Sequence, residues 1–283
     1  MNKNSLLEDF YGATIGIIGF GHLGHSLAVP LVRNGLPKER LMISHRGSEA
    51  TRNHAVKLGL ESCLTDTPVL MSRADIIIVA TRPQDVLSLP GDVVKPGSLV
   101  ISCMAGLPID LLKTIFRGDV RRMMCSGPDT ILEGRGVATM YPADPRTDDV
   151  LRLMGMRIFG SSFEEELDSF TVGICIPAIL LNMRLDEDDV KSAILGMERR
   201  YPVYGALRGW IEEVTPPDLA LDTDDRRANL ENVSTKGGIT QAMTSVLLEG
   251  GSFGAALRRG MERGQEITDA IRAEIMTSSK RAV

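Results

Sequence analysis

The residues best suited to chemistry stand near the start of the chain, where three glycines follow an apolar run. Residues 15–18 form that run, and Gly19, Gly21 and Gly24 come directly after it in the pattern GxGxxG. In a dinucleotide-binding turn the first glycine permits the tight turn, the second lets the backbone approach a pyrophosphate, and the third lets the helix lie close to the sheet. The N–H groups and positive dipole end of that helix then hold the phosphates. A purely structural glycine turn is the alternative, but the sequence favours a bound dinucleotide, with the cofactor-binding residues Gly19, Phe20, Gly21, His22, Leu23 and Gly24.

The next candidate residues follow the second expected strand. In NAD-binding forms of the turn, an acidic residue about 20 positions beyond the glycines accepts hydrogen bonds from the ribose. Here that place holds Ser44, His45 and Arg46, with no carboxylate. Arginine binds phosphate through a fork of charged hydrogen bonds. The sequence therefore predicts NADP(H), with these three residues at the 2′-phosphate, against the alternative of a solvated turn with a surface arginine.

Alternating strands and helices are expected to position these residues. Apolar, β-branched runs occur at residues 40–44, 74–80, 99–103, 120–124 and 136–141, and helix-length segments separate most of them. Residues 74–80 are apolar almost throughout, as in a strand buried on both faces of a parallel sheet. They lead into Thr81, Arg82 and Pro83, at the carboxyl edge where such sheets place their ligands. The pattern predicts an α/β fold whose N-terminal part is a Rossmann-type, doubly wound parallel sheet.

The second half of the chain has a different texture. From about residue 164 strand-like runs nearly vanish, and segments rich in Leu, Met, Ala, Glu and Arg take over. We expect two domains, an NADP-binding domain at residues 1–164 and a helical domain at residues 165–283. Residues 170–183 should be a buried helix, and 186–189 should begin another, because acidic residues suit the positive dipole end. The helix breaks are expected at Pro202, Pro216 and Pro217, and no function is assigned to the charged stretch 222–227.

Composition excludes several classes of protein. A net charge of −5 and a pI near 5.5 give no electrostatic footprint for nucleic acid. The four cysteines are widely spaced without a CxxC pair, which favours reduced thiols and a cytoplasmic location. The N-terminus lacks a signal-peptide pattern, and the longest apolar run is too short to span a membrane. The histidine pair at 22 and 25 has no third ligand nearby, so no metal site is predicted.

Several short segments resemble, in order, those of the pyrroline-5-carboxylate reductases. Besides the glycine turn, residues 80–84 (Ala-Thr-Arg-Pro-Gln) resemble that family's Ala-Val-Lys-Pro-Gln loop, and 102–106 (Ser-Cys-Met-Ala-Gly) resemble its Ser-Ile-Ala-Ala-Gly segment. Residues 235–240 (Thr-Lys-Gly-Gly-Ile-Thr) resemble its Ser-Pro-Gly-Gly-Thr-Thr signature, and 246–251 also read like the family. The matches span nearly the whole chain.

The resemblance implies an NADPH-dependent reductase in which hydride passes to the C=N bond of a small cyclic imino acid. It implies an NADPH-binding domain, a helical C-terminal domain that forms a homodimer or higher oligomer, and an active site between them. The hydroxyl of Thr240 would act in catalysis near the substrate nitrogen, and Thr235, Lys236, Gly237 and Gly238 would bind the substrate carboxylate. Cofactor contacts would come from Thr81, Arg82 and Pro83 and from Met104, Ala105 and Gly106.

The substrate side departs from the family pattern. Ser126 stands where the family has an asparagine, and Ile174 and Ile176 replace two glycines. These departures favour reduction of an imine or a carbonyl in general over proline biosynthesis in particular. A non-catalytic dinucleotide-binding sensor or interaction protein is the main alternative. A β-hydroxyacid dehydrogenase is disfavoured, because its lysine should stand three residues before an asparagine, and counting back from Asn182 gives Ile179.

Overall fold

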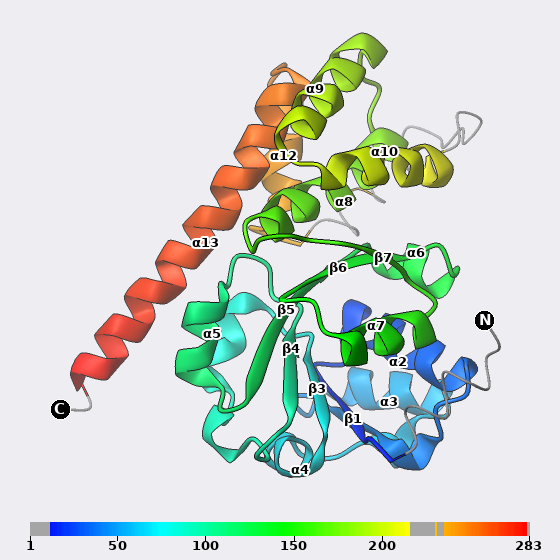
Figure 1. Ribbon diagram of the computed structural model, residues 1–283, viewed down its shortest axis with the longest axis vertical. Coiled ribbons are helices and arrows are strands. Elements are labelled where there is room, and N and C mark those ends of the chain that lie inside the picture. Colours follow the sequence, from blue (N-terminus) through cyan, green and yellow to red (C-terminus); the bar gives the residue numbers. More distant parts are fainter. Residues whose placement is uncertain (1–11, 216–229, 231–234, 282–283) are drawn as a thin grey trace.

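The structure is a computed structural model, and it describes residues 12–215, 230 and 235–281 of the chain. The expected helix breaks at Pro216 and Pro217 and the charged stretch 222–227 lie outside the described residues. Figure 1 shows two parts, a sheet with helices packed around it and a group of helices on one side, from which the long C-terminal helix runs past the sheet.

The described residues form one seven-stranded sheet with the order β2-β1-β3-β4-β5-β6-β7. The strands are β1 (Ile15–Ile18), β2 (Leu41–Ser44), β3 (Ile76–Val79), β4 (Leu99–Ser102), β5 (Asp119–Cys125), β6 (Val137–Tyr141) and β7 (Arg157–Phe159). All neighbours pair in parallel except β5 and β6, which are antiparallel. The chain passes from β1 to β2 on one side and then returns to β3 on the other. The strand order therefore reverses at β1, and the carboxyl end of β1 is the switch point where open α/β sheets bind ligands.

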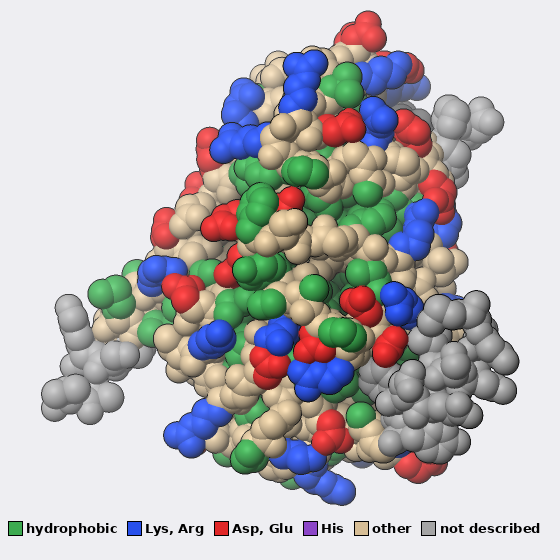
Figure 2. All heavy atoms as spheres, in the orientation of Figure 1, with side chains coloured by type: hydrophobic (Ala, Val, Ile, Leu, Met, Phe, Trp, Pro, Cys, Tyr) green, Lys and Arg blue, Asp and Glu red, His purple; other side chains and the backbone are tan. Residues whose placement is uncertain are grey.

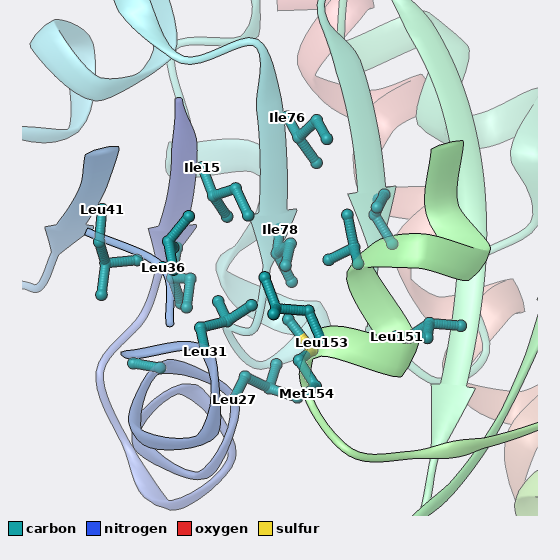
Figure 3. Close-up of a cluster of buried hydrophobic side chains, with 14 of the residues drawn as sticks. Ile15, Leu27, Leu31, Leu36, Leu41, Ile76, Ile78, Leu151, Leu153 and Met154 are labelled. Atoms are coloured by element: carbon teal, nitrogen blue, oxygen red, sulfur yellow. The ribbon is translucent and has the colours of Figure 1, made fainter. Parts of the chain in front are cut away.

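Helices cover both faces of this sheet. They are α2 (His22–Arg33), α3 (Glu49–Lys57), α4 (Thr67–Arg73), α5 (Ile109–Ile115), α6 (Pro128–Leu132) and α7 (Pro145–Leu153), with short 3₁₀ turns η1 (Lys38–Arg40), η2 (Glu61–Cys63), η3 (Pro83–Ser88) and η4 (Gly91–Val93). In β3, Ile78 belongs to the core cluster beneath α2 and α7, drawn in Figure 3, whereas Ile77 and Val79 belong to the cluster on the opposite face. Successive side chains of a strand point to opposite faces, so a strand buried on both sides is apolar throughout, as predicted.

The helical part contains α8 (Glu166–Asn182), α9 (Glu187–Arg200), α10 (Val203–Val214), α12 (Ile239–Leu248) and α13 (Phe253–Arg281). The buried helix expected at 170–183 is α8, whose Phe170 and Ile176 have no exposed surface. The start expected at 186–189 is confirmed, since the Asp186 carboxylate caps α9 by accepting from the Asp189 N–H at 2.8 Å.

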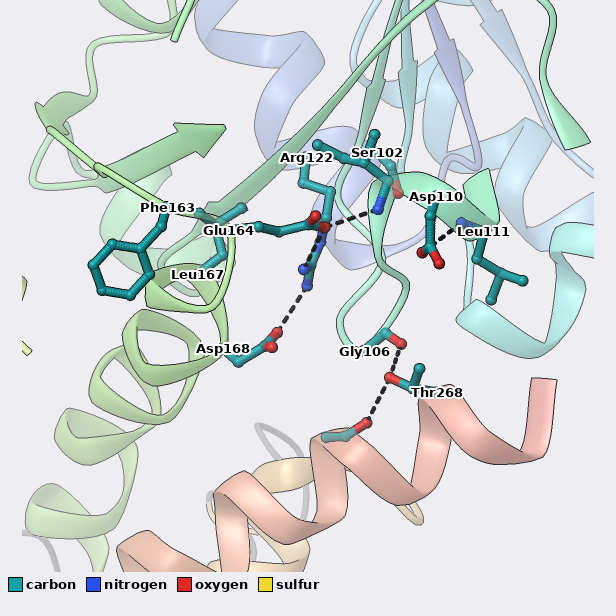
Figure 4. Close-up of polar contacts among 12 residues, drawn as sticks. Ser102, Gly106, Asp110, Leu111, Arg122, Phe163, Glu164, Leu167, Asp168 and Thr268 are labelled. Carbon is teal, nitrogen blue, oxygen red and sulfur yellow. Dashed lines mark hydrogen bonds and ion pairs between the residues drawn. The ribbon is translucent and has the colours of Figure 1, made fainter. Parts of the chain in front are cut away.

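Apolar packing and ion pairs are among the contacts that join the two parts. Helix α13 packs on α12, α9 and α8. Its Ile267 and Ile271 belong to the same core cluster as Ile77 and Val79 of β3. Arg122 of β5 is 2% exposed and pairs with Glu164 (2.9 Å) and Asp168 (2.8 Å), as Figure 4 shows. The last strand and α8 lie on either side of residue 164, but whether residues 1–164 and 165–283 fold as separate domains stays a prediction.

The predicted fold class is confirmed, with one refinement. The N-terminal part has the Rossmann-type arrangement and the C-terminal part is helical. The antiparallel pairing of β6 and the short strand β7 were not predicted. Among the described residues, no helix is both long enough and apolar enough to cross a membrane.

Candidate functional site

The glycine turn lies at the switch point, and two of its glycines are required by the fold itself. Gly19 has φ +95°, and its N–H donates to the Ser44 carbonyl at 2.9 Å. A Cβ at Gly19 would lie 2.9 Å from the Ala80 carbonyl oxygen, and one at Gly24 would lie 1.8 Å from the Gly19 carbonyl oxygen. Backbone therefore approaches backbone at both positions, which only glycine permits.

Gly21 is different, because it faces open space. A Cβ built there would meet no atom within 4 Å, and Gly21 is exposed. It is the N-cap of α2, which has no side-chain cap. The amides of the first turn of α2 are therefore available to an anion. This arrangement fits a pyrophosphate. The neighbouring His22 is also exposed, whereas the side chains of Phe20 and Leu23 pack in or against the core.

The residues predicted for the 2′-phosphate have three different environments. Ser44 has no exposed surface, and its hydroxyl accepts a hydrogen bond from Thr67 at 3.0 Å. The prediction that this hydroxyl faces a phosphate is therefore not supported, because the last residue of β2 points into the fold. His45 accepts from the Gly47 N–H through Nδ1, and Arg46 is 66% exposed and ion-paired with Asp85 of η3.

A line of contacts runs from the glycine turn along the carboxyl edge of the sheet. A Cβ at Gly19 would also lie 3.0 Å from the Thr81 methyl group. The Thr81 hydroxyl in turn donates to the Met104 sulfur at 3.7 Å. Arg82 is exposed at the start of η3, whose first residue is Pro83. The loops after β1, β3 and β4 thus meet side by side, as the topology requires.

Gly106 connects this line to the C-terminal helix. Its φ is +75°, and its carbonyl accepts a hydrogen bond from the Thr268 hydroxyl of α13 (Figure 4). A Cβ at Gly106 would lie 2.8 Å from the Gly264 carbonyl oxygen. The segment Met104, Ala105 and Gly106 is therefore held against α13. This role of α13 was missed from the sequence, where nothing connects residue 106 to residue 268.

The glycine loop at 235–240 contacts the same stretch of α13. Arg263 donates from Nε to the Gly237 carbonyl at 2.8 Å. Arg263 and Thr268 are five residues apart, or about 7.5 Å along a helix. A short stretch of α13 therefore touches both the Gly106 segment and the Gly237 loop, which are distant in sequence. Thr235 and Lys236 are exposed beside this loop.

The amides of the glycine loop correct one expectation. The Gly237 N–H donates to the Gln241 side chain at 2.5 Å, and the Gly238 N–H donates to the Thr235 carbonyl at 2.8 Å. Both donors are thus used by contacts within residues 235–241 and do not face an anion. Helix α12 begins directly after Gly238 without a side-chain cap, so the donors next to the loop belong to its first turn.

Thr240, in the first turn of α12, contacts α8. Its hydroxyl donates to the Cys175 sulfur at 3.2 Å. Burial raises the pKa of the Cys175 thiol to about 11, although the hydrogen bond from Thr240 acts to lower it. The thiol is therefore neutral near pH 7, and Thr240 keeps its oxygen lone pairs for another partner.

The three residues that differ from the reductase pattern, Ser126, Ile174 and Ile176, make contacts within the fold. Ser126 is 1% exposed, and its hydroxyl accepts from the Val137 N–H (3.1 Å) and the Thr130 hydroxyl (2.8 Å). It does not replace a ligand-facing amide. Ile176 is fully buried in the helical core, and Ile174 packs against that core. Within the described part of the chain, no three His, Cys, Asp or Glu side chains are grouped to hold a metal ion.

Part of the chain matches a family model. Residues 14–106 match the family described as NADP oxidoreductase, coenzyme F420-dependent. The matched segment includes the glycine turn, Arg46, and the loops after β3 and β4. The match bears out NADP(H) as the predicted cofactor.

Similar proteins of known sequence are pyrroline-5-carboxylate reductases. That of Aquifex aeolicus is 26% identical over 123 residues, so the alignment spans 44% of this chain and 45% of that enzyme. That of Haemophilus influenzae is 23% identical over 282 residues, which span 89% of this chain and 97% of that enzyme.

Solved structures give the same fold. The pyrroline-5-carboxylate reductase of Streptococcus pyogenes has a TM-score of 0.57 at 18% identity, and covers 90% of this chain and 98% of its own. The Plasmodium falciparum pyrroline carboxylate reductase with NADP bound has a TM-score of 0.54 at 19% identity, and covers 91% of this chain and 98% of its own.

The family model and the fold together point to an NAD(P)-dependent oxidoreductase with a Rossmann-type part and a helical part. The resemblance read from the motifs is confirmed. Within that class, the chain is similar to the pyrroline-5-carboxylate reductases in sequence and in fold.

Proposed function

We propose that this protein is an NADPH-dependent reductase of a small cyclic imino acid, similar to the pyrroline-5-carboxylate reductases. The observation that carries the proposal is the convergence on one stretch of α13. Thr268 binds Gly106 beside the nucleotide turn, and Arg263 binds Gly237 beside Thr240. A cofactor on the turn and a substrate on the glycine loop would therefore be neighbours.

The cofactor would be held by the turn around Gly21, where the open space and uncapped amides suit a pyrophosphate. When bound, NADPH supplies the hydride. Arg46 would pair with the 2′-phosphate, and the loops at Thr81 and Met104 would line the path toward the helical part. The chain's own contribution is orientation, since a protonated imine is already electrophilic.

Thr240 would bind the substrate nitrogen as a hydrogen-bond acceptor. Its own proton is directed to Cys175, so a protonated imine N–H can donate to the free lone pairs of Thr240 Oγ1. Cys175 is then a positioning residue. The substrate carboxylate would lie near the exposed Lys236 and the first-turn amides of α12 rather than on the amides of Gly237 and Gly238.

We also infer a homodimer formed through the helical part. Leu195, Leu248 and Met276 are 43%, 74% and 61% exposed. Figure 2 shows hydrophobic side chains gathered over the helices and their junction with the sheet. Exposed apolar area of this kind marks interaction surfaces. We further propose a role in proline biosynthesis, which requires that the substrate is pyrroline-5-carboxylate, and a cytoplasmic location, which the free cysteines support.

The test is steady-state oxidation of NADPH with pyrroline-5-carboxylate and other carboxylated cyclic imines. We expect kcat to fall about 10-fold to 100-fold for Thr240→Val and to recover in Thr240→Ser, with NADPH affinity unchanged in both, because a hydrogen bond to a charged group contributes about 1.5–3 kcal/mol. A Thr240→Val enzyme as active as wild type would remove Thr240 from the site. Tight NADPH binding without turnover of any imine would instead support the non-catalytic alternative.

A further inference from the structure

The residue predicted to hold the 2′-phosphate already has an anionic partner. Arg46 follows β2, whereas Asp85 lies in η3, which follows β3, and the two side chains form an ion pair. The Arg46 side chain is 66% exposed, but the Asp85 carboxylate is only 23% exposed. The less exposed carboxylate therefore lies next to an exposed cation at the carboxyl edge of the sheet.

We propose that Asp85 is a specificity-determining residue that narrows the preference for NADPH over NADH. The inference rests on the proposed function, because it requires a nucleotide on the glycine turn with its ribose at Arg46. In the free protein Asp85 occupies the guanidinium that a 2′-phosphate would use.

Two physical effects of Asp85 both lower the affinity for NADPH. First, the fork of Arg46 can be fully engaged by a carboxylate or by a phosphate, so a 2′-phosphate must displace Asp85 or share the guanidinium with it. Second, the Asp85 carboxylate stays close after it is displaced from Arg46, and it repels a 2′-phosphate that carries nearly two negative charges. NADH has a ribose hydroxyl in that place, and a hydroxyl can donate to a carboxylate. Asp85 therefore costs affinity for NADPH and costs none for NADH.

Asp85 also supplies a carboxylate near the end of β2, where the sequence lacks an acidic residue. In NAD-binding forms the acidic residue comes from β2 itself. Here residues 44–46 contain none, but η3 brings a carboxylate to Arg46 from another loop. The ribose end of the site thus combines the arginine typical of NADP forms with a carboxylate of the kind that NAD forms use.

The experiment measures calorimetric binding of NADP⁺ and NAD⁺ to wild type and Asp85→Asn. We expect NADP⁺ to bind about threefold to tenfold more tightly to the variant, with NAD⁺ unchanged or weaker, because one close charge at a solvated site is removed. The gain should shrink as salt rises, which a purely structural effect would not do. Asp92→Asn is the matched control. Asp92 is exposed in η4, which contacts the segment before β5, at the amino ends of the strands and away from the carboxyl edge where Asp85 lies. Asp92→Asn should therefore change the affinity for neither NADP⁺ nor NAD⁺.

A double-mutant cycle with Arg46→Ala separates the competition for Arg46 from the charge repulsion. Without Arg46, Asp85→Asn should improve NADP⁺ binding less than it does in wild type, since only the repulsion remains. The inference is overturned if Asp85→Asn leaves the ratio of NADP⁺ to NAD⁺ affinity unchanged or lowers it. If wild type binds neither nucleotide, the proposed function fails as well, which is a different outcome from nucleotide binding that is indifferent to residue 85.

Discussion

Replacing Gly21 by alanine should weaken nucleotide binding by about 100-fold without weakening the fold. The added Cβ meets no atom within 4 Å, and the residue has φ −81° and ψ −161°, a conformation that alanine adopts readily. We therefore expect the free energy of unfolding to change by about 0.5 kcal/mol or less. The methyl group would stand where the pyrophosphate must approach the backbone. An NADPH affinity loss of about 100-fold corresponds to about 2.7 kcal/mol.

Gly24→Ala is the contrasting variant. Its Cβ would lie 1.8 Å from the Gly19 carbonyl oxygen, so either α2 or the turn must move. Overpacking of this kind costs about 1–3 kcal/mol. Gly24→Ala should thus lose stability as well as binding, whereas Gly21→Ala should lose binding alone.

Urea unfolding and NADPH titration, measured on the same preparations, separate the two effects. The reasoning fails if Gly21→Ala binds NADPH as tightly as wild type, because the pyrophosphate would then lie elsewhere. It fails equally if Gly21→Ala is as unstable as Gly24→Ala, because the space at Gly21 would not be open.

Two further predictions concern buried charges. Arg122→Met should lower the free energy of unfolding by about 3 kcal/mol in urea, the low end for a broken buried pair, because Glu164 and Asp168 keep 24% and 40% exposure; a loss below about 1 kcal/mol would contradict this. The pKa of the Asp144 carboxyl lies below its ordinary value of 3.8, chiefly because Arg146 donates to it, so its stabilisation is complete above that value and is lost as the pH falls through the folded-state pKa. Asp144→Asn should therefore be less stable than wild type at neutral pH and lose less stability below about pH 4; parallel acid-unfolding curves would refute the assignment.

The short range of most interactions explains what the sequence predicted well. The glycine spacing at 19–24 predicts a turn because Gly19 has a positive φ and Gly24 lies against the Gly19 carbonyl, whereas Gly21 leaves open space in front of the helix. The apolar residues of β3 indicate a strand buried on two faces, and Asp186 marks a helix start through a bond to an amide three residues away. The three-residue strand β7 escaped prediction because so short a run carries no period.

The sequence by itself therefore determined the class of protein, the nucleotide turn, the cofactor and the helical second half. Only the tertiary structure decided which of the predicted residues are exposed at the proposed site and which are buried or paired with other side chains. Ser44 ends a strand as predicted, yet its hydroxyl points into the core. Arg46 meets Asp85, and Thr240 meets Cys175, because the strand order and the path of the helices bring distant segments together. Such pairs leave no mark in local spacing or periodicity, since their geometry depends on the packing of the whole chain.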